Sequence, residues 1–199
     1  KTRRINEMWQ TDFTYFKIIG WGWYYLSTII DDYSRFIIAW DLCSQMTSKD
    51  VMPSVDKALQ FAGIKKDDAP KLLSDNGSCY ISEELKSFLR ERGIKPINGK
   101  PMHPQTQGKI ERYHRTMKNV VKLDNYYSPE DLIKAISEFV KYYNYERYHE
   151  SLRNLTPADV YFGRDKQILN ERSKIKEKSM KERRINYIFS KFELDYEKS

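Results

Sequence analysis

Apolar residues in the first part of the chain form short runs rich in aromatic and β-branched residues. Such runs, bounded by turn residues, are typical of strands. They cover Met8 to Ile19, Trp21 to Asp31 and Arg35 to Leu42. Gly20 and Gly22 mark the first turn, and Asp31-Asp32-Tyr33-Ser34 marks the second. Three strands joined by short turns predict an antiparallel meander.

The apolar spacing then changes to a helical period. Val51, Val55 and Ala58 recur at helical intervals, which predicts a helix over 48–61 with Ser48 as its N-cap and Gly63 at its end. The elements predicted next are a strand at 70–74, a helix beginning near Ser82, a strand at 94–97, a breaker-rich loop at 98–108, a helix at about 107–123 and a helix from Ser128 towards Tyr145. This order predicts a mixed α/β sheet flanked by helices.

The helix predicted at 107–123 carries two different stripes. At about 100° per residue, one stripe is apolar and belongs to a core. The second stripe is polar and basic and lies within roughly 40° of Glu111. The apolar stripe consists of Ile110, Tyr113, Met117 and Val121, and the basic stripe of Gln107, Arg115, Lys118 and Lys122. A carboxylate followed by a basic row suits a metal ligand beside a track for a phosphate backbone.

Composition narrows the class of partner. The formal net charge is +7 and the pI is near 9.2, which favours an anionic partner such as nucleic acid. Cys43 and Cys79 form no CxxC pair and, with three scattered histidines, lack the spacing of a structural zinc site. Two cysteines in 199 residues suggest a reducing compartment. No apolar run approaches the ~20 residues that span a bilayer.

Three carboxylates stand out by their positions. Asp12 lies inside an aromatic strand, where burying a charge is costly unless it is paired or bound to metal. Asp75 follows a strand and precedes Asn76-Gly77, which is also a common turn. Glu111 lies one turn into a helix, where an exposed surface glutamate is also common. Two strand aspartates and a helix glutamate can converge at one sheet edge, and hard divalent cations prefer such oxygen ligands.

The chain resembles the integrase-type DDE transposases of bacterial insertion sequences, which are relatives of retroviral integrases. The resemblance covers about residues 5 to 163, and 35 residues separate Asp75 from Glu111, as in the family. Five stretches carry it: Trp9-Gln10-Thr11-Asp12-Phe13-Thr14, Ile30-Asp31-Asp32-Tyr33-Ser34-Arg35, Leu73-Ser74-Asp75-Asn76-Gly77, His103-Pro104-Gln105-Thr106-Gln107-Gly108-Lys109-Ile110-Glu111-Arg112, and Tyr143-Asn144 through Thr156-Pro157. It implies an α/β ribonuclease-H-like fold, with a five-stranded mixed sheet (an antiparallel meander plus parallel strands) flanked by helices.

The same resemblance implies a chemistry. Asp12 would bridge two Mg²⁺ ions, for which Mn²⁺ can substitute, while Asp75 and Glu111 would each hold one. Water would cleave the ends of a transposon, and the freed 3′-hydroxyl would join target DNA in an in-line displacement, without a covalent protein intermediate. A nuclease that hydrolyses nucleic acid without strand transfer is the alternative. A non-catalytic DNA-binding module is a third hypothesis, which predicts the loss of an acid.

Further expectations concern DNA contacts and partners. By resemblance, Gln107, Arg115 and Lys118 contact DNA ends. Asn76 and Lys109 lie beside the acids and Lys122 continues the basic stripe, so we expect DNA contacts there as well. Tyr113 fits a core position equally well, Asp31 and Asp32 are read as a turn with Arg35 pairing nearby, and Arg147 and His149 as packing groups. The expected partners are transposon-end and target DNA and further copies of the chain on paired ends, with no membrane and no small-molecule cofactor.

The end of the chain differs in character. Between Arg164 and Arg184 there are nine Lys or Arg and four Asp or Glu residues. We expect an integrase-type core at 1–163 and a basic, helical extension at 164–199. The extension contacts DNA or a second protomer, or else is a solvated connector, and 185–194 could add a strand or an arm. The resemblance further implies that a helix-turn-helix region precedes Lys1 and that the protein is bacterial and cytoplasmic, nucleoid-associated when bound to DNA.

Overall fold

The computed structural model describes residues 2–99 and 108–196 of the chain. The chain divides into two compact units, one ending at Tyr161 and the other beginning at Phe162. Most of the predicted loop at 98–108 lies outside the described residues, and so does the predicted contact residue Gln107. Of that stretch, Asn98 ends a strand and Gly108 begins a helix.

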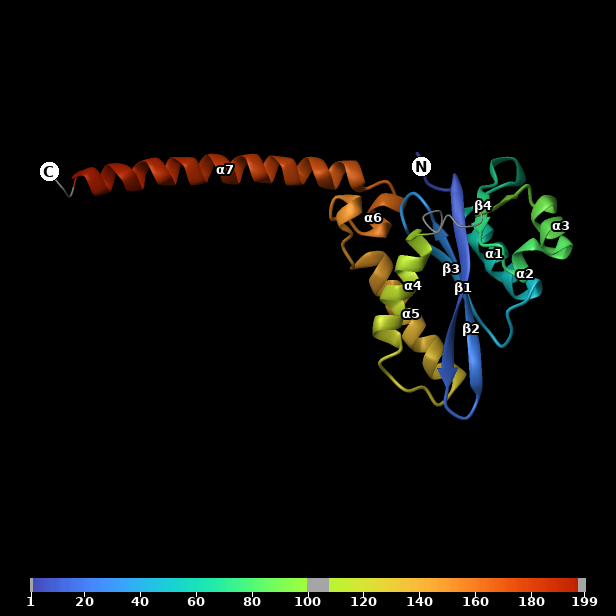
Figure 1. The fold of residues 1–199 in the computed structure, drawn as a ribbon. Coiled ribbons are helices and arrows are strands. Elements are labelled where there is room, and N and C mark those ends of the chain that lie inside the picture. The colour runs from blue at the N-terminus through green and yellow to red at the C-terminus, as the bar shows by residue number, and fades with distance from the viewer. Residues whose placement is uncertain (1, 100–107, 197–199) are drawn as a thin grey trace. The chain divides into compact units, whose positions relative to one another are not determined.

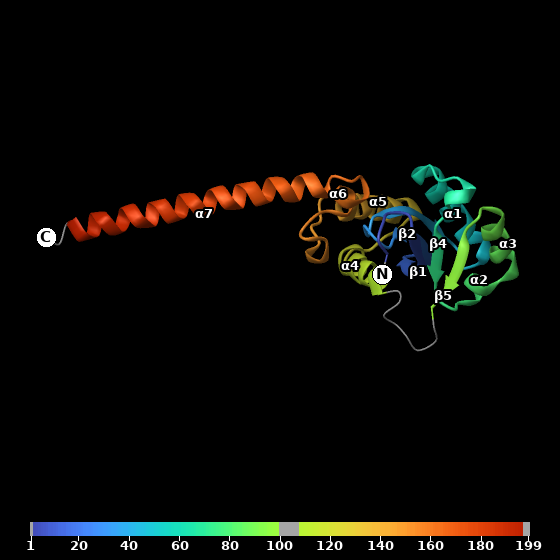
Figure 2. The ribbon, with the colours of Figure 1, turned by 90° about the horizontal axis from the view of Figure 1, so that it is seen from above.

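The first unit is built on a five-stranded sheet with the strand order β3-β2-β1-β4-β5. β1 pairs antiparallel with β2, and β2 pairs antiparallel with β3, so the predicted meander is confirmed. β4 pairs parallel with β1 on one side and with β5 on the other. Figure 2 shows β5 beside α3. The bounds are β1 (Met8–Ile18), β2 (Gly22–Asp31), β3 (Ile37–Cys43), β4 (Lys71–Ser74) and β5 (Lys95–Asn98).

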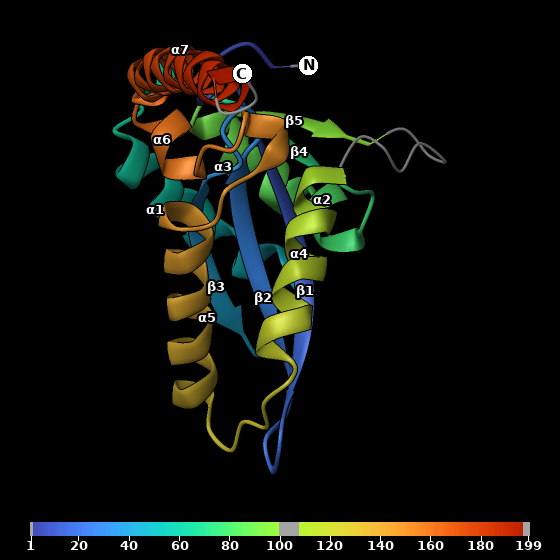
Figure 3. The same cartoon turned by 90° about the vertical axis from the view of Figure 1, so that its left-hand side faces the viewer.

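Helices cover both faces of the sheet. α1, α2 and α3 lie on one side, and α4 and α5 lie on the other (Figure 1). Figure 3 shows α4 beside β1 and α5 beside β3. The described helices of this unit are α1 (Ser48–Ala62), α2 (Ser78–Ile81), α3 (Glu83–Glu91), α4 (Gly108–Val121), α5 (Pro129–Tyr145) and α6 (Pro157–Tyr161), with 3-10 helices at Lys66–Asp68 and Glu150–Leu152.

Each face of the sheet has its own hydrophobic core, because successive strand residues point to opposite faces. Trp9 of β1 packs in the core formed with α1 and α3. Phe16 and Ile18 of the same strand pack in the core formed with α4 and α5. The predicted apolar stripe of α4 is confirmed, since all four of its residues are buried in this second core: Ile110, Tyr113, Met117 and Val121. With that stripe buried, Arg115 and Lys122 of the basic stripe are exposed and Lys118 is partly exposed.

The helix ends follow local rules, with one prediction wrong by a residue. The N-cap of α1 is Thr47 rather than Ser48, because the Asp50 carboxylate accepts a hydrogen bond from the Thr47 backbone N–H at 2.9 Å. Gly63, with φ of +62°, ends that helix as predicted. Ser128 caps α5 and Pro129 occupies its first turn, as the sequence indicates. The short helix α2 was not predicted.

The second unit contains a single described helix, α7 (Asp165–Tyr196), of 32 residues. The helix predicted for 164–184 is confirmed. Residues 185–194 continue this helix, so the strand considered for them is not formed. Among the described residues, no helix combines the length and the apolar character needed to cross a membrane.

Candidate active site

Asp12 lies in the middle of β1, half-buried at the edge of a pocket of about 360 Å³. Its Oδ2 atom is 3.3 Å from Nδ1 of His114, a buried residue of α4. Among the described residues, Nε2 of the same imidazole is buried without a hydrogen-bond partner. The ring also packs against Tyr113, with ring centres 5.3 Å apart. Because its ring is buried and packed, His114 restrains the orientation of the Asp12 carboxylate.

Glu111 reaches the same pocket from the first turn of α4. A carboxylate in the first helical turn is favoured by the helix dipole. Arg115 and Lys118 follow Glu111 along the pocket wall, as the basic stripe predicts. The pocket is lined by Asp12, Phe13, Thr14, Glu111, His114, Arg115, Lys118 and Asn119. The structure therefore places one strand carboxylate, one helix carboxylate and two cations around one opening.

Asp75 directly follows Ser74, the last residue of β4, and β4 is the strand next to β1, which carries Asp12. The parallel pairing of β1 with β4 ends at Gln10 and Leu73. Continued by two residues, the same offset would bring Asp75 opposite Asp12, and paired strands are about 4.8 Å apart. We therefore expect the two aspartates to be neighbours at the carboxyl end of β4. Burial together with the nearby charges of Asp75 and Asp12 raises the pKa of the Cys79 thiol to about 11. One thiol thus experiences both carboxylates, which agrees with their proximity.

The Asp75 carboxylate is held by its own turn. Its Oδ1 accepts a hydrogen bond from the Gly77 backbone N–H at 2.8 Å. A Cβ on Gly77 would lie 2.9 Å from the same oxygen, so a side chain there would push the carboxylate aside. The predicted turn at Asp75-Asn76-Gly77 therefore exists and also fixes the direction of the acid. Asn76, a predicted DNA contact, donates from Nδ2 to the Gly99 carbonyl at 3.1 Å.

The donor set fits a hard divalent cation, although the three acids are not gathered as ligands of one ion. Among the residues that the structure describes, no three Asp, Glu, His or Cys side chains are grouped closely enough to hold a metal. Within the same residues, none of Asp12, Asp75 and Glu111 forms an ion pair with a Lys or Arg side chain. Neighbouring carboxylates without an internal cation repel one another, and a bound divalent cation would relieve that repulsion.

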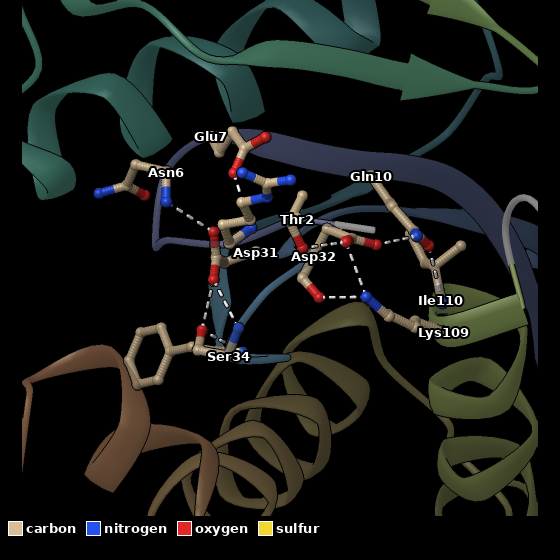
Figure 4. A network of polar contacts seen from close by, with 11 residues as sticks. Thr2, Asn6, Glu7, Gln10, Asp31, Asp32, Ser34, Lys109 and Ile110 are labelled. Atoms are coloured by element: carbon tan, nitrogen blue, oxygen red, sulfur yellow. Dashed lines mark hydrogen bonds and ion pairs between the residues drawn. The ribbon is translucent and has the colours of Figure 1, made fainter. Parts of the chain in front are cut away.

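A buried polar network connects the start of α4 with β1 (Figure 4). Gln10, two residues before Asp12, accepts a hydrogen bond from the Ile110 backbone N–H at 3.1 Å and donates to Asp32 at 2.6 Å. Lys109 forms an ion pair of 2.7 Å with Asp32, whose side chain is 5% exposed. Thr2 also donates to Asp32 at 2.6 Å. The network links residues adjacent in sequence to Glu111 with the strand that carries Asp12.

This network bears on two expectations. Lys109, a predicted DNA contact, forms an ion pair with Asp32 and is 30% exposed, and its contact with DNA stays a prediction. The predicted turn is present, because Asp31 accepts hydrogen bonds from Ser34, yet the ion pair of Asp32 is made by Lys109 rather than by Arg35. Sequence reasoning missed Gln10 and Asp32 as supports of the site. The available signal was the polar Gln10 directly after Trp9, in a strand with several aromatic residues.

The remaining predicted contacts lie along α4 or in its core. Lys118 and Lys122 place their ammonium groups 4.6 and 4.8 Å from the ring centre of Tyr15. Arg115 is exposed. Tyr113 is 1% exposed, so its core alternative is the correct one. His149 packs edge-on against Tyr143 with ring centres 5.0 Å apart, as expected of a packing group.

The sheet order and the helices on both faces define a ribonuclease-H-like fold, and two carboxylates lie in a pocket between β1 and α4. The chain belongs to the integrase core domain family. Two models of that family, each described as an integrase core domain, match residues 2–104 and 92–157. It is thereby a transposase or integrase core of this superfamily.

Similar sequences occur in transposases and in retroviral polyproteins. The transposase for insertion sequence element IS904 of Lactococcus lactis is 32% identical over 144 residues, which are 71% of this chain and 54% of that protein. The Gag-Pro-Pol polyprotein of mouse mammary tumor virus is 30% identical over 130 residues, or 63% of this chain. The chain matches only 7% of that polyprotein. It therefore corresponds to a part of these relatives.

Solved structures share the fold at lower identity. The catalytic core domain of HTLV-2 integrase in complex with magnesium superimposes with a TM-score of 0.63 at 22% identity, covering 81% of this chain and 99% of that chain. A chain of the simian T-cell lymphotropic virus intasome gives a TM-score of 0.68 at 24% identity, covering 81% of this chain and 57% of that one. These likenesses confirm the ribonuclease-H-like architecture.

Proposed function

We propose that this chain is the catalytic core of a DNA transposase that cleaves transposon ends and joins the resulting 3′-hydroxyls to target DNA. The observation that carries the proposal is the pocket shared by Asp12 and Glu111. The register of β1 and β4, continued by two residues, would bring Asp75 opposite Asp12. Arg115 and Lys118 line the same pocket and supply positive charge for a phosphate backbone. The sequence relationship to a bacterial transposase supports this function.

Asp12, Asp75 and Glu111 are the residues that would hold Mg²⁺, or Mn²⁺ in its place. Two such ions, when bound, activate an attacking oxygen and neutralise the leaving oxygen of an in-line displacement. Carboxylates from two strands and one helix supply oxygen ligands and leave positions open for water and phosphate. The solved HTLV-2 core, which contains magnesium, supports a divalent metal here.

The other pocket residues act on geometry and charge. His114 holds the Asp12 carboxylate through its Nδ1 atom. Arg115 and Lys118 bind the phosphates on either side of the reacting one, and water or a 3′-hydroxyl attacks from the open side of the pocket. Several copies of the chain would act on paired DNA ends, an assembly supported by the intasome relative.

The test uses a duplex carrying the terminal repeats of the element, once intact and once with the 3′ end already freed. We expect nicking of the first, and joining of the second to a plasmid, only with Mg²⁺ or Mn²⁺. Asp12→Asn, Asp75→Asn and Glu111→Gln should each lower both rates by at least about 100-fold, the scale of one lost electrostatic contact in catalysis.

The control is Glu138→Gln, which removes an exposed carboxylate of α5 and should leave both rates unchanged. Nicking without joined products would favour the hydrolytic nuclease instead. Full activity in any of the three acid variants would exclude that residue from the site.

A further inference from the structure

Two large aromatic rings are exposed on the hairpin formed by β1 and β2. Tyr15 of β1 is 48% exposed and Trp23 of β2 is 52% exposed. Their ring centres are 5.4 Å apart and their planes meet at 75°. The register pairs Tyr15 with Tyr25 and Lys17 with Trp23, so the two rings are diagonal neighbours on one face of the hairpin. Exposed aromatic pairs of this kind commonly mark an interaction surface.

Two cations adjoin these rings. Lys118 and Lys122, one turn apart on α4, place their ammonium groups against the ring of Tyr15. Within the described part of the chain, neither lysine forms an ion pair with a carboxylate. Their charge is therefore available to an anionic partner. We call the four side chains Tyr15, Trp23, Lys118 and Lys122 the hairpin ledge.

The hairpin ledge is continuous with the acidic pocket. Lys118 lines the pocket and also contacts Tyr15. Tyr15 is three residues from Asp12 along β1, which corresponds to about 10 Å at about 3.3 Å per residue. About three nucleotides stacked at ~3.4 Å cover that length. β1 pairs with β4 at Met8, Trp9 and Gln10. The rest of β1, up to the hairpin, extends beyond β4.

We propose that the hairpin ledge binds unpaired bases of a DNA strand whose reacting phosphate lies in the acidic pocket, about three nucleotides away. Trp23 stacks on a base, and Lys118 and Lys122 bind the adjoining phosphates. Unpaired bases are the fitting occupants because base pairs inside a duplex are stacked on both faces, whereas an unpaired base can turn a face to the protein. An apolar protein surface fits poorly, because it would bury two ammonium groups without counter-charges. The inference rests on the proposed function, since it places the strand through the catalytic pocket.

The test measures binding in EDTA, so that it is independent of catalysis. The full chain is titrated, by fluorescence anisotropy, into a blunt duplex and into a duplex of equal length with a five-nucleotide single-stranded end. Stacking on one aromatic ring contributes about 1–3 kcal/mol. Trp23→Ala should therefore weaken binding of the tailed DNA by about 5- to 140-fold at 1.4 kcal/mol per tenfold. Binding of the blunt duplex should change little.

Two further variants separate stacking from a structural effect. Trp23→Phe keeps a ring and should restore most of the affinity for the tailed DNA. Tyr142→Ala removes a comparably exposed aromatic ring of α5 and should leave both affinities unchanged. Lys122→Gln should reduce the slope of log affinity against log salt by about 0.7 for the tailed DNA, the value for one phosphate contact on a single strand.

Equal affinities of the Trp23→Ala variant and the parent chain for tailed DNA would overturn the proposal, and so would equal weakening on both DNAs. Binding to anionic lipid vesicles that Trp23→Ala abolishes, with both DNA affinities intact, would assign the surface to a membrane instead and would also overturn it. Selective loss of tailed-DNA binding in a chain that neither nicks nor joins DNA with Mg²⁺ would support the hairpin ledge and contradict the proposed function. The two failures are thus distinguishable.

Discussion

Removing the charge of Asp32 tests whether the polar network fastens α4 to β1. The substitution Asp32→Asn keeps the shape of the side chain and removes its charge. Asp32 is buried and binds Gln10, Thr2 and Lys109. The ion pair with Lys109 is the interaction that this substitution removes outright.

The magnitude follows from burial on both sides of the ion pair. Breaking a fully buried pair by removing one partner costs about 3–5 kcal/mol. The Asp32 side chain is 5% exposed, but that of Lys109 is 30% exposed, so water recovers part of the loss. We expect Asp32→Asn to lower the free energy of unfolding by about 2–3 kcal/mol. At a urea m-value of about 2 kcal/mol/M, the midpoint falls by about 1–1.5 M.

The assay is urea unfolding followed by tryptophan fluorescence, since Trp9 in β1 is fully buried. Lys86→Met serves as the control because its partner Glu83 is 80% exposed, and an exposed pair contributes only about 0–1 kcal/mol. A double-mutant cycle with Asp32→Asn and Lys109→Met should give a coupling above about 1 kcal/mol. A midpoint no lower than that of Lys86→Met, or a coupling near zero, would refute the reasoning.

Three further predictions concern the site and its surroundings. Replacing Gly77 by alanine puts a Cβ 2.9 Å from Asp75 Oδ1 and should displace the carboxylate. We expect Mg²⁺-dependent nicking to fall at least about 10-fold, while the melting temperature is nearly kept. Ser78→Ala is the control, and unchanged nicking in Gly77→Ala would show that the direction of the carboxylate is unimportant. His114→Ala frees the Asp12 carboxylate and should slow nicking by about 10- to 100-fold, the usual effect of losing a group that orients a metal ligand; an unchanged rate would remove His114 from the site. Burial, with nearby arginine charges, lowers the pKa of His149 from 6.5 to about 4. The contribution of neutral His149 to stability is therefore complete above pH 6.5 and is lost as the pH falls towards 4. His149→Phe should reduce the slope of unfolding free energy against pH between pH 4 and 6.5, and an identical slope in both proteins would contradict the shift.

Local sequence patterns determine most of the elements, because they depend on residues close together in the chain. Periodicity and turn residues predict β1, β2 and β3 to within about two residues, and the signals at Ser128 and Gly63 mark helix ends correctly. The predicted N-cap of α1 was wrong by one residue because Thr47 and Ser48 are both good N-caps. The side chain of Asp50 bonds the backbone N–H of Thr47 and so selects Thr47. Residues 185–194 have an aromatic content that suits a strand, yet they continue α7.

The sequence by itself determined which carboxylates were conspicuous: Asp12 because a charge within an aromatic strand is costly, and Glu111 because the row after it is basic. Only the tertiary structure decided how they are placed. The strand order places the end of β4, which precedes Asp75, beside β1, which carries Asp12. Gln10 joins Asp32 and Ile110, and Ile110 is 100 residues away in sequence. Such contacts leave no local pattern, because they arise only when distant elements pack together. For the same reason only the structure shows that Lys109 pairs with Asp32 and that Lys118 contacts the ring of Tyr15.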